Sequence, residues 1–299
     1  MIKETTLGNY SQSNYSKTLE INNIDFTAFL VKQLKLGYGS RTLVKDVSFE
    51  LHPCECVLLA GANGTGKTTL LRALAEVGRG SETYATLGIA TPKIGRFSGA
   101  PDSTLRGAHL WEGRRSRSDR RVSDPLPTSA LIPTNIPKVK GFTVESFIQT
   151  GCYRESDWKG RISKEVEDRM EEALDILGIQ ELRYRDISTL SDGEFQKACL
   201  ATGLTRRAEV LLLDEPTAHL DVENRIDVLR TLREVARKTG TAILFSSHDL
   251  HDALPVADRV FVLTRDGRFL SSGTDDKEAA LQAAFPNFNR QADGTLSDQ

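Results

Sequence analysis

The stretch Gly61-Ala62-Asn63-Gly64-Thr65-Gly66-Lys67-Thr68-Thr69 decides the fold of this chain. It follows the apolar run Val57–Ala60 and leads into Leu70–Ala75, which indicates the start of a helix. Its residues fit the pattern G-x-x-x-x-G-K-[ST], in the order of buried strand, glycine-rich turn and helix. Glycines let backbone N–H groups surround phosphate oxygens, and the helix N-terminus adds a favourable dipole. The stretch therefore predicts a phosphate-binding loop.

Two side chains of this loop carry its chemistry. Lys67 is expected to neutralise the β- and γ-phosphates of ATP, in binding and in catalysis, and the Thr68 hydroxyl to ligate Mg²⁺. The remaining binding residues that we expect in the loop are Gly61, Asn63, Gly64, Thr65, Gly66 and Thr69.

A second apolar run, Val210–Leu213, ends in the carboxylates Asp214 and Glu215. An acid at the tip of a central strand is costly unless a cation or donor compensates it, and Mg²⁺ would compensate Asp214. Glu215 would face the γ-phosphate and orient or deprotonate the attacking water. Taken alone, such a pair is most often a strand end that meets solvent, so this interpretation depends on the phosphate loop.

Strand-like runs alternate with helical patterns along the chain, which favours an α/β fold around a buried parallel sheet. Besides the runs above, strands are expected at 29–36, 47–51, 130–133, 242–245, 260–263 and 268–270. A helix is expected between an N-cap at Ser163 and a stop at Gly178, and another after a capping box at Ser191–Glu194. An amphipathic helix is expected around Ile226, Leu229, Leu232 and Val235.

From the composition and the phosphate loop, we expect an extension at 1–27, an ATP-binding domain at 28–275 and a polar tail at 276–299. Within the domain, about 77–128 is rich in Gly, Ser, Pro and Arg and has little apolar periodicity. This composition predicts a loop insertion that is solvated or contacts lipid headgroups or a partner.

Composition narrows the class of protein. Of 299 residues, 39% are hydrophobic and 27% charged, and the net charge of -2 gives no reason to expect nucleic acid as a partner. No apolar stretch reaches the roughly 18 residues that a spanning helix needs, and we expect no signal segment. No C-x-x-C pair occurs among the cysteines, so we expect buried or reduced thiols at Cys54, Cys56, Cys152 and Cys199.

Five motifs in order resemble those of ABC ATPases. After the phosphate loop, Leu190-Ser191-Asp192-Gly193-Glu194 resembles the signature motif and Leu213–Thr217 the Walker B motif. Ala218–Asp221 is similar to the D-loop, and Ser246-Ser247-His248-Asp249 to the segment of the switch histidine. Tyr38 falls where the family stacks an aromatic ring on adenine, although an ordinary packed tyrosine is the alternative. The resemblance covers Phe29 to Leu270 apart from the insertion.

The resemblance implies a P-loop NTPase (RecA-like) core with a helical signature subdomain at about 141–204 and an antiparallel β subdomain. It also implies a homodimer that holds each ATP between the phosphate loop of one copy and the signature helix of the other. Ser191 and the Gly193 backbone would then dock the γ-phosphate at a helix N-terminus. His248 would contact the same phosphate and hold Glu215 and the water in register.

The sequence departs from the family pattern at two positions. Asp192 stands where glycine is common, and its carboxylate would repel phosphate unless it pointed away. Thr134 stands where a glutamine usually reaches Mg²⁺ and the water, and its shorter side chain would need a bridging water to do so. Coupling to a membrane partner through Thr134 is therefore in doubt, whereas nucleotide binding is not.

The segment Pro133–Gly151 resembles ATPases of importers for iron chelates, haem or cobalamin. The resemblance implies a peripheral subunit at the cytoplasmic face of the inner membrane, with a membrane permease as its partner and a substrate-binding protein acting indirectly. Two alternatives stay open. One is an ABC ATPase of translation or DNA repair, and the other a nucleotide switch without hydrolysis, against which Glu215 and His248 argue.

Overall fold

The computed structural model describes residues 28–38, 41–77, 129–273, 276–285, 289–290 and 296–297. The expected extension at 1–27 and nearly all of the expected insertion at 77–128 lie outside the described residues. The structure therefore bears on the ATP-binding domain and on part of the segment after it.

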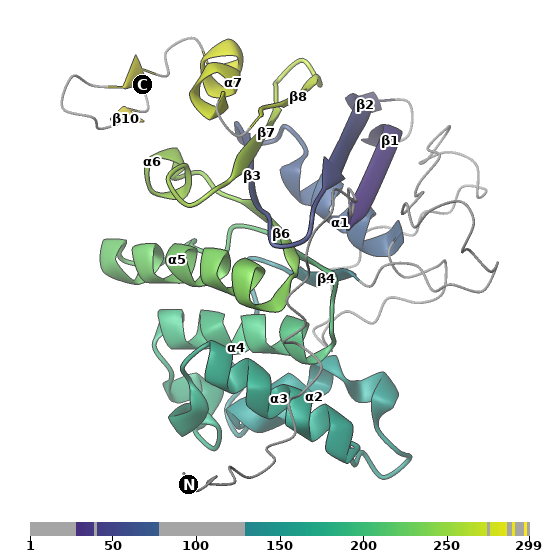
Figure 1. Ribbon diagram of the computed structural model, residues 1–299, viewed down its shortest axis with the longest axis vertical. Coiled ribbons are helices and arrows are strands. Elements are labelled where there is room, and N and C mark those ends of the chain that lie inside the picture. The colour runs from purple at the N-terminus through teal and green to yellow at the C-terminus, as the bar shows by residue number, and fades with distance from the viewer. Residues whose placement is uncertain are drawn as a thin grey trace, which may run out of the picture.

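A six-stranded sheet forms the centre of the molecule (Figure 1). Its strand order is β4-β5-β6-β3-β7-β8, with β8 antiparallel to β7 and the other pairs parallel. The bounds are Cys56–Gly61 for β3, Ser129–Ile132 for β4, Val210–Leu213 for β5, Ala242–Ser246 for β6, Arg259–Leu263 for β7 and Phe269–Ser271 for β8. The predicted α/β fold with a buried parallel sheet is confirmed.

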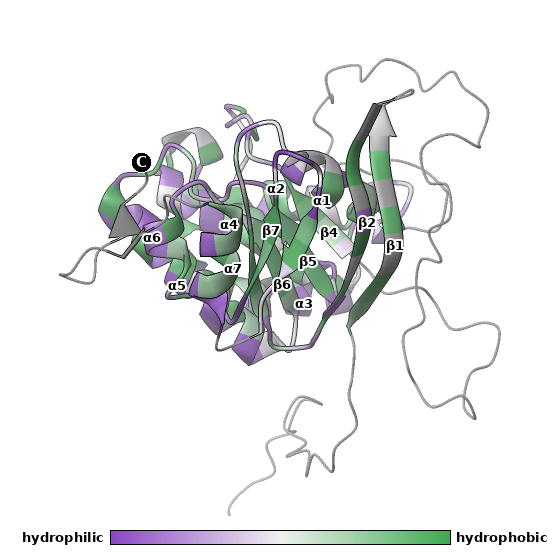
Figure 2. Ribbon diagram, turned by 90° about the horizontal axis from the view of Figure 1, so that it is seen from above, coloured by the Kyte–Doolittle hydropathy of each residue, from purple (hydrophilic) through white to green (hydrophobic). Residues whose placement is uncertain are grey.

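Side chains of the central strands point alternately to two hydrophobic clusters, one on each face of the sheet. In β3, Leu58 belongs to one cluster and Leu59 to the other, as the two-residue period of a strand requires. Both faces are covered, so the strands are apolar throughout, and Figure 2 shows them as hydrophobic ribbons inside the molecule. Burial on both faces explains why the sequence shows these strands as continuous apolar runs.

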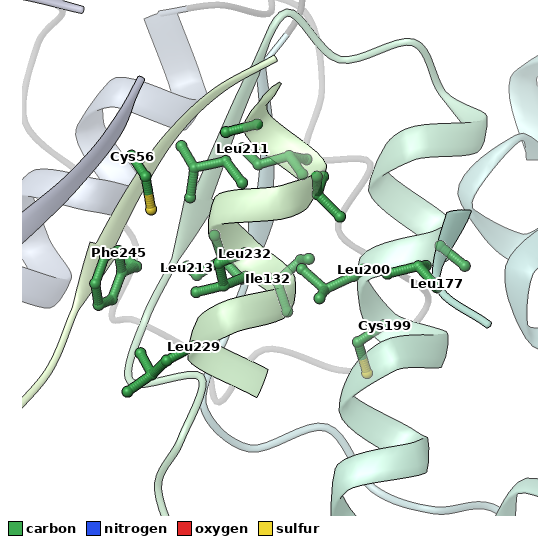
Figure 3. Close-up of a cluster of buried hydrophobic side chains, with 14 of the residues drawn as sticks. Cys56, Ile132, Leu177, Cys199, Leu200, Leu211, Leu213, Leu229, Leu232 and Phe245 are labelled. Carbon is green, nitrogen blue, oxygen red and sulfur yellow. The ribbon is translucent and has the colours of Figure 1, made fainter. Parts of the chain in front are cut away.

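Helices cover one face of the sheet in two layers. The helix α5 (Val222–Thr239) packs on the strands, and α4 (Asp192–Thr205) lies beside it, as Figure 3 shows for Leu232 and Leu200. The helices α2 (Val144–Gly151) and α3 (Lys164–Ile176) pack on α4 and complete the helical subdomain. Short 3₁₀ turns in this subdomain lie at Tyr153–Glu155, Gln180–Leu182 and Ile187–Thr189.

The opposite face of the sheet is covered by α1 (Lys67–Val77) and by an antiparallel pair of strands, β1 (Phe29–Tyr38) and β2 (Arg41–Leu51). The strand β2 begins at Arg41, six residues before the expected start at Val47. It is longer because its early residues pair with the end of β1.

The predicted helix boundaries agree with the cap geometry. Ser163 caps α3 by accepting a hydrogen bond from the Val166 N–H, and Gly178 follows the helix with φ of 63°. Ser191 and Glu194 form the expected capping box at the start of α4. These ends were predictable because a cap needs only residues within one turn of each other.

Part of the expected polar tail is helical. The helix α7 (Lys277–Ala284) buries Leu281 against the cluster that α5 also covers. The remaining elements are the short helix α6 (Leu250–Ala253) and a two-stranded ladder of β9 (Asn289–Arg290) and β10 (Leu296–Ser297).

Gly267, in the turn between β7 and β8, fixes the distance between that hairpin and β2. Its φ is 78°, and an added Cβ would lie 2.5 Å from the Leu43 carbonyl oxygen. We expect Gly267→Ala to lower the free energy of unfolding by about 2–4 kcal/mol, from the left-handed backbone and the clash together. Gly160, with φ of 76° and no atom within 4 Å of an added Cβ, is the matched control. Urea titrations that give equal losses for both variants would contradict this.

Burial divides the four thiols into two groups. Cys54 is exposed, whereas the other three are buried. Burial raises the pKa of Cys152 to about 11 and raises the pKa values of Cys56 and Cys199 further. Since the thiolate is the reactive form, we expect iodoacetamide at pH 8 to modify Cys54 first in the folded protein, and all four in denaturant. Peptide mass spectrometry checks this, and early labelling of Cys199 would contradict it.

Candidate active site

The phosphate loop lies between the end of β3 and the start of α1, as predicted. Gly64 and Gly66 have φ of 78° and 103°, values that glycine adopts without strain. An added Cβ at Gly61 would lie 2.7 Å from the Leu263 carbonyl oxygen, so no larger residue fits there. The Thr65 hydroxyl donates to the Ala62 carbonyl at 2.9 Å and closes the turn.

Lys67 is buried inside this loop. Its ammonium donates to the Gly61 carbonyl at 2.7 Å and to the Ala62 carbonyl at 3.4 Å. Burial lowers the pKa of Lys67, while the nearby carboxylates of Glu215 and Asp214 act in the opposite direction. A buried cation in a glycine-rich loop at the start of a helix suits an anionic ligand, because the anion compensates the lost solvation.

The tip of β5 places a buried carboxylate beside the loop. The Asp214 N–H donates to the Ile132 carbonyl at 2.9 Å, which ties this tip to the neighbouring strand β4. Its side chain is buried, and Oδ1 accepts a hydrogen bond from the Ser246 hydroxyl at 3.0 Å. Asp214 is thus held in one orientation next to the Lys67 ammonium.

Glu215 has an unusual backbone and a direct partner. Its φ is 50°, in the left-handed region that costs a residue with a side chain about 1–2 kcal/mol. Its N–H donates to the Ser246 hydroxyl at 2.9 Å, and its Oε1 lies 2.5 Å from Nε2 of His248. The structure therefore brings together the two residues that the sequence predicts for water activation.

Ser246 is a functional residue whose role the sequence did not reveal. It is fully buried, and one hydroxyl both donates to Asp214 and accepts from the Glu215 N–H. The register of the sheet places Ser246 beside Asp214. Leu213 pairs with Phe245 in neighbouring parallel strands, so the residues that follow them meet at the same edge of the sheet. Without the strand order, no residue pattern links Ser246 to Asp214.

The predicted signature residues begin α4. Ser191 is exposed, and its backbone N–H and hydroxyl both take part in the capping box with Glu194. Gly193 is buried against α5, where an added Cβ would lie 3.0 Å from the Asn224 side-chain oxygen. Asn224 in turn bonds Asp221, the N-cap of α5, so the starts of α4 and α5 are packed as one unit.

Both departures from the family pattern have partners in the structure. The Asp192 carboxylate lies 2.6 Å from the Lys138 ammonium, so its charge is balanced within the chain. The Thr134 hydroxyl donates to the Asp214 backbone carbonyl at 2.8 Å. Thr134 therefore lies next to the site, in direct contact with the backbone of Asp214. Its contact with Mg²⁺ stays a prediction.

Arg225, which the sequence did not single out, joins α5 to the segment after His248. Its Nη1 lies 2.9 Å from Asp249 and 3.2 Å from Asp252. Since Asp249 follows His248 directly, Arg225 helps to position the histidine relative to α5. Of the other predicted residues, Asn63 and Gly64 are exposed and Thr68 and Thr69 are half-buried, while the side chain of Tyr38 lies outside the described residues.

The arrangement can hold a triphosphate on the loop and present Glu215 to a water at its far end. A loop of this kind beside a strand that ends in two acids places the protein in the class of P-loop ATPases. Comparison with known proteins gives the family. Residues 44–218 match the family model described as "ABC transporter", which covers more than half of the chain. The chain belongs to this family, and it is an ATPase.

Curated relatives cover most of the chain. It is 31% identical over 242 residues to the ferric enterobactin transport ATP-binding protein of Escherichia coli K12, with 81% of this chain and 80% of that protein covered. It is 30% identical over 263 residues to the achromobactin transport ATP-binding protein of Dickeya dadantii 3937, with 87% and 88% covered.

The fold is shared with a solved structure, an inward-facing conformation of a metal-chelate type ABC transporter. The TM-score is 0.65 at 19% identity, with 90% of this chain and 95% of that chain covered. The predicted P-loop ATPase core with its helical subdomain is thereby confirmed.

Removal of the Ser246 hydroxyl tests its bridging role. We expect Ser246→Ala to lower the free energy of unfolding by about 1–3 kcal/mol, because the buried Asp214 carboxylate loses its donor and the Glu215 N–H its acceptor. We also expect kcat of ATP hydrolysis to fall, because Asp214 and Glu215 are no longer held together. Ser271→Ala, at an exposed position of β8, is the control. Unchanged kcat in Ser246→Ala would show that the bridge is dispensable.

Proposed function

We propose that the chain is the ATP-binding and hydrolysing subunit of an importer for an iron chelate, and that it energises a separate membrane permease. The observation that carries the proposal is the Glu215–His248 contact at the tip of β5, beside a buried Lys67 in the phosphate loop. The cargo class is supported by the relatives, whose names describe transport of ferric enterobactin, achromobactin and petrobactin.

In the proposed reaction, the phosphate loop binds ATP and Lys67 offsets the charge of its terminal phosphates. Thr68 and Asp214 are the residues that would hold Mg²⁺, which would draw charge from the phosphate oxygens when bound. The Asp214 carboxylate fits such a cation, because it is buried and the Ser246 hydroxyl fixes its orientation. Glu215 orients the attacking water and accepts its proton, and His248 restrains the Glu215 carboxylate through their contact.

A second copy of the chain completes the site in this proposal. The hydrogen bonds of Ser191 stay within its own helix, and the exposed start of α4 is free to meet a phosphate loop across an interface. A helix N-terminus stabilises an anion, so the signature helix of one copy suits the γ-phosphate bound to the other. ATP would thereby join two copies, and hydrolysis would release them.

The helical subdomain supports the proposed permease contact. It carries most of the large exposed apolar side chains among the residues that the structure describes, including Tyr153, Trp158 and Tyr184. Exposed aromatic residues are typical of protein contact surfaces. In the described parts of the chain, no helix is both long enough and apolar enough to cross a bilayer. A peripheral position at the cytoplasmic face, with the permease in the membrane, accords with this proposal.

Glu215→Gln separates binding from hydrolysis. The amide keeps the shape of the side chain but cannot accept a proton from water, so we expect ATP binding to persist and kcat to fall by about 10²-fold or more. The ATP-bound dimer should then accumulate. Size-exclusion chromatography with ATP and Mg²⁺ checks this, with ADP as the control nucleotide. A variant that stays monomeric with ATP would count against the dimer, and one that still hydrolyses ATP against the role of Glu215.

The same variant tests transport in cells. A strain that lacks this gene should lose uptake of radioactive iron supplied as a siderophore complex, and the wild-type gene should restore it. Glu215→Gln should not restore uptake, although the protein accumulates to the same level. Normal uptake in the deletion strain would remove the iron-chelate proposal and leave the ABC ATPase without its proposed cargo.

A further inference from the structure

The start of α4 carries two carboxylates where the proposed function places a phosphate. Asp192 and Glu194 both lie in the first turn of the helix. Negative charge in this turn is favoured by the helix dipole, but it opposes a second anion at the same helix end. A phosphate can dock here only if both carboxylates are neutralised by nearby cations or held off the docking face.

Each carboxylate has a cation from another segment. Glu194 accepts from the Ser191 N–H in the capping box, and its second oxygen lies 3.7 Å from Arg185. Asp192 lies 2.6 Å from the Lys138 ammonium, a much closer contact. Lys138 comes from the segment between β4 and α2, more than fifty residues away in the chain. The first turn of α4 is therefore balanced in charge by residues outside the helix.

Lys138 is fixed more firmly than the lysine of an ordinary surface ion pair. Its ammonium also donates to the Leu190 carbonyl at 2.8 Å, and it lies 5.4 Å from the centre of the Phe195 ring. Its side chain is only 25% exposed, whereas that of Asp192 is 63% exposed. Exposed ion pairs contribute little because both partners are mobile, but here the cation is held and the carboxylate is drawn to it.

We propose that Lys138 is a positioning residue that neutralises Asp192 and draws its carboxylate away from the phosphate-docking face of α4. The pair allows a signature motif with aspartate in its third position to bind ATP across the dimer. The inference rests on the proposed function, because it assumes that the start of α4 meets the γ-phosphate bound to a second copy. Within its own chain, Lys138 would act through Asp192 and would not touch the nucleotide.

The proposal predicts an effect of the charge of Lys138, whereas a purely structural role through Leu190 and Phe195 predicts none. Lys138→Gln keeps a polar side chain of similar reach but removes the cation, so Asp192 would repel the incoming phosphate. In the Glu215→Gln background, we expect the ATP concentration for half-maximal dimerisation to rise about tenfold. In the catalytically active chain, KM for ATP should rise by a similar factor while kcat changes little, because the hydrolytic residues are untouched.

Removal of the carboxylate should repair the defect. In the double variant Lys138→Gln/Asp192→Asn, no unpaired charge remains, and we expect half-maximal dimerisation within about twofold of the parent. Lys138→Arg, which keeps the cation, should behave like the parent. Lys164→Ala is the matched control, since Lys164 pairs with Asp168 on the exposed face of α3. Light scattering against ATP concentration gives all these values.

Two results would overturn the proposal. One is parental dimerisation in Lys138→Gln, and the other is a double variant that stays as weak as Lys138→Gln, which would mean that Lys138 acts through Leu190 and Phe195 alone. Binding of a fluorescent ADP to the monomer verifies that every variant is folded, because the phosphate loop does not contact this pair. Failure of the Glu215→Gln parent to dimerise with ATP would instead reject the proposed function itself.

Discussion

The hydrogen bonds of one buried hydroxyl hold the acidic centre of this protein together. Ser246 donates to the Asp214 carboxylate and accepts from the Glu215 N–H, and Glu215 keeps its left-handed backbone with that support. These contacts exist because β5 and β6 are parallel neighbours whose carboxyl ends meet at the same edge of the sheet. The phosphate loop follows β3 at that edge as well, since β3 is the next strand in order. The parallel sheet thus places the phosphate loop, the two acids and Ser246 at one edge.

Charge in the molecule is arranged in two separate groups. At the sheet edge, a buried ammonium on Lys67 faces the two acids, and burial lowers the pKa of that ammonium. At the start of α4, two carboxylates are each met by a cation from elsewhere in the chain. The group at the start of α4 is close to balance without a ligand. At the sheet edge one ammonium faces two carboxylates, so a magnesium ion that enters with the triphosphate would offset the excess negative charge. The segment from Thr134 to Lys138 joins the two groups, because it contacts the residue after β5 at one end and the first residue of α4 at the other.

Most of the secondary structure was predictable because its signals are local. The strand β5 occupies the expected residues Val210–Leu213, and the capping box at Ser191 lies where its residues indicated. Prediction was weaker where an element depends on pairing or packing with another element. The early half of β2 forms because β1 pairs with it, and α7 forms in the expected tail because Leu281 finds a place in the core. Tyr38 pairs with Arg41 close by in the chain, whereas Leu281 packs against a cluster that includes residues as far away as Cys56.

The sequence by itself predicted the phosphate loop and, beside that loop, the roles of the acids after β5, and its resemblance to ABC ATPases added the histidine after β6. The chemistry of the loop follows from a few neighbouring positions, whereas the role of the histidine follows from the family pattern. The tertiary structure alone decided which of their side chains meet. It paired Glu215 with His248 and placed the Ser246 hydroxyl between the Asp214 carboxylate and the Glu215 N–H. It also brought Lys138 and Arg225 to residues far along the chain. These contacts depend on strand order and helix packing, because a hydrogen bond or ion pair is sensitive to ångström distances that sequence separation does not encode.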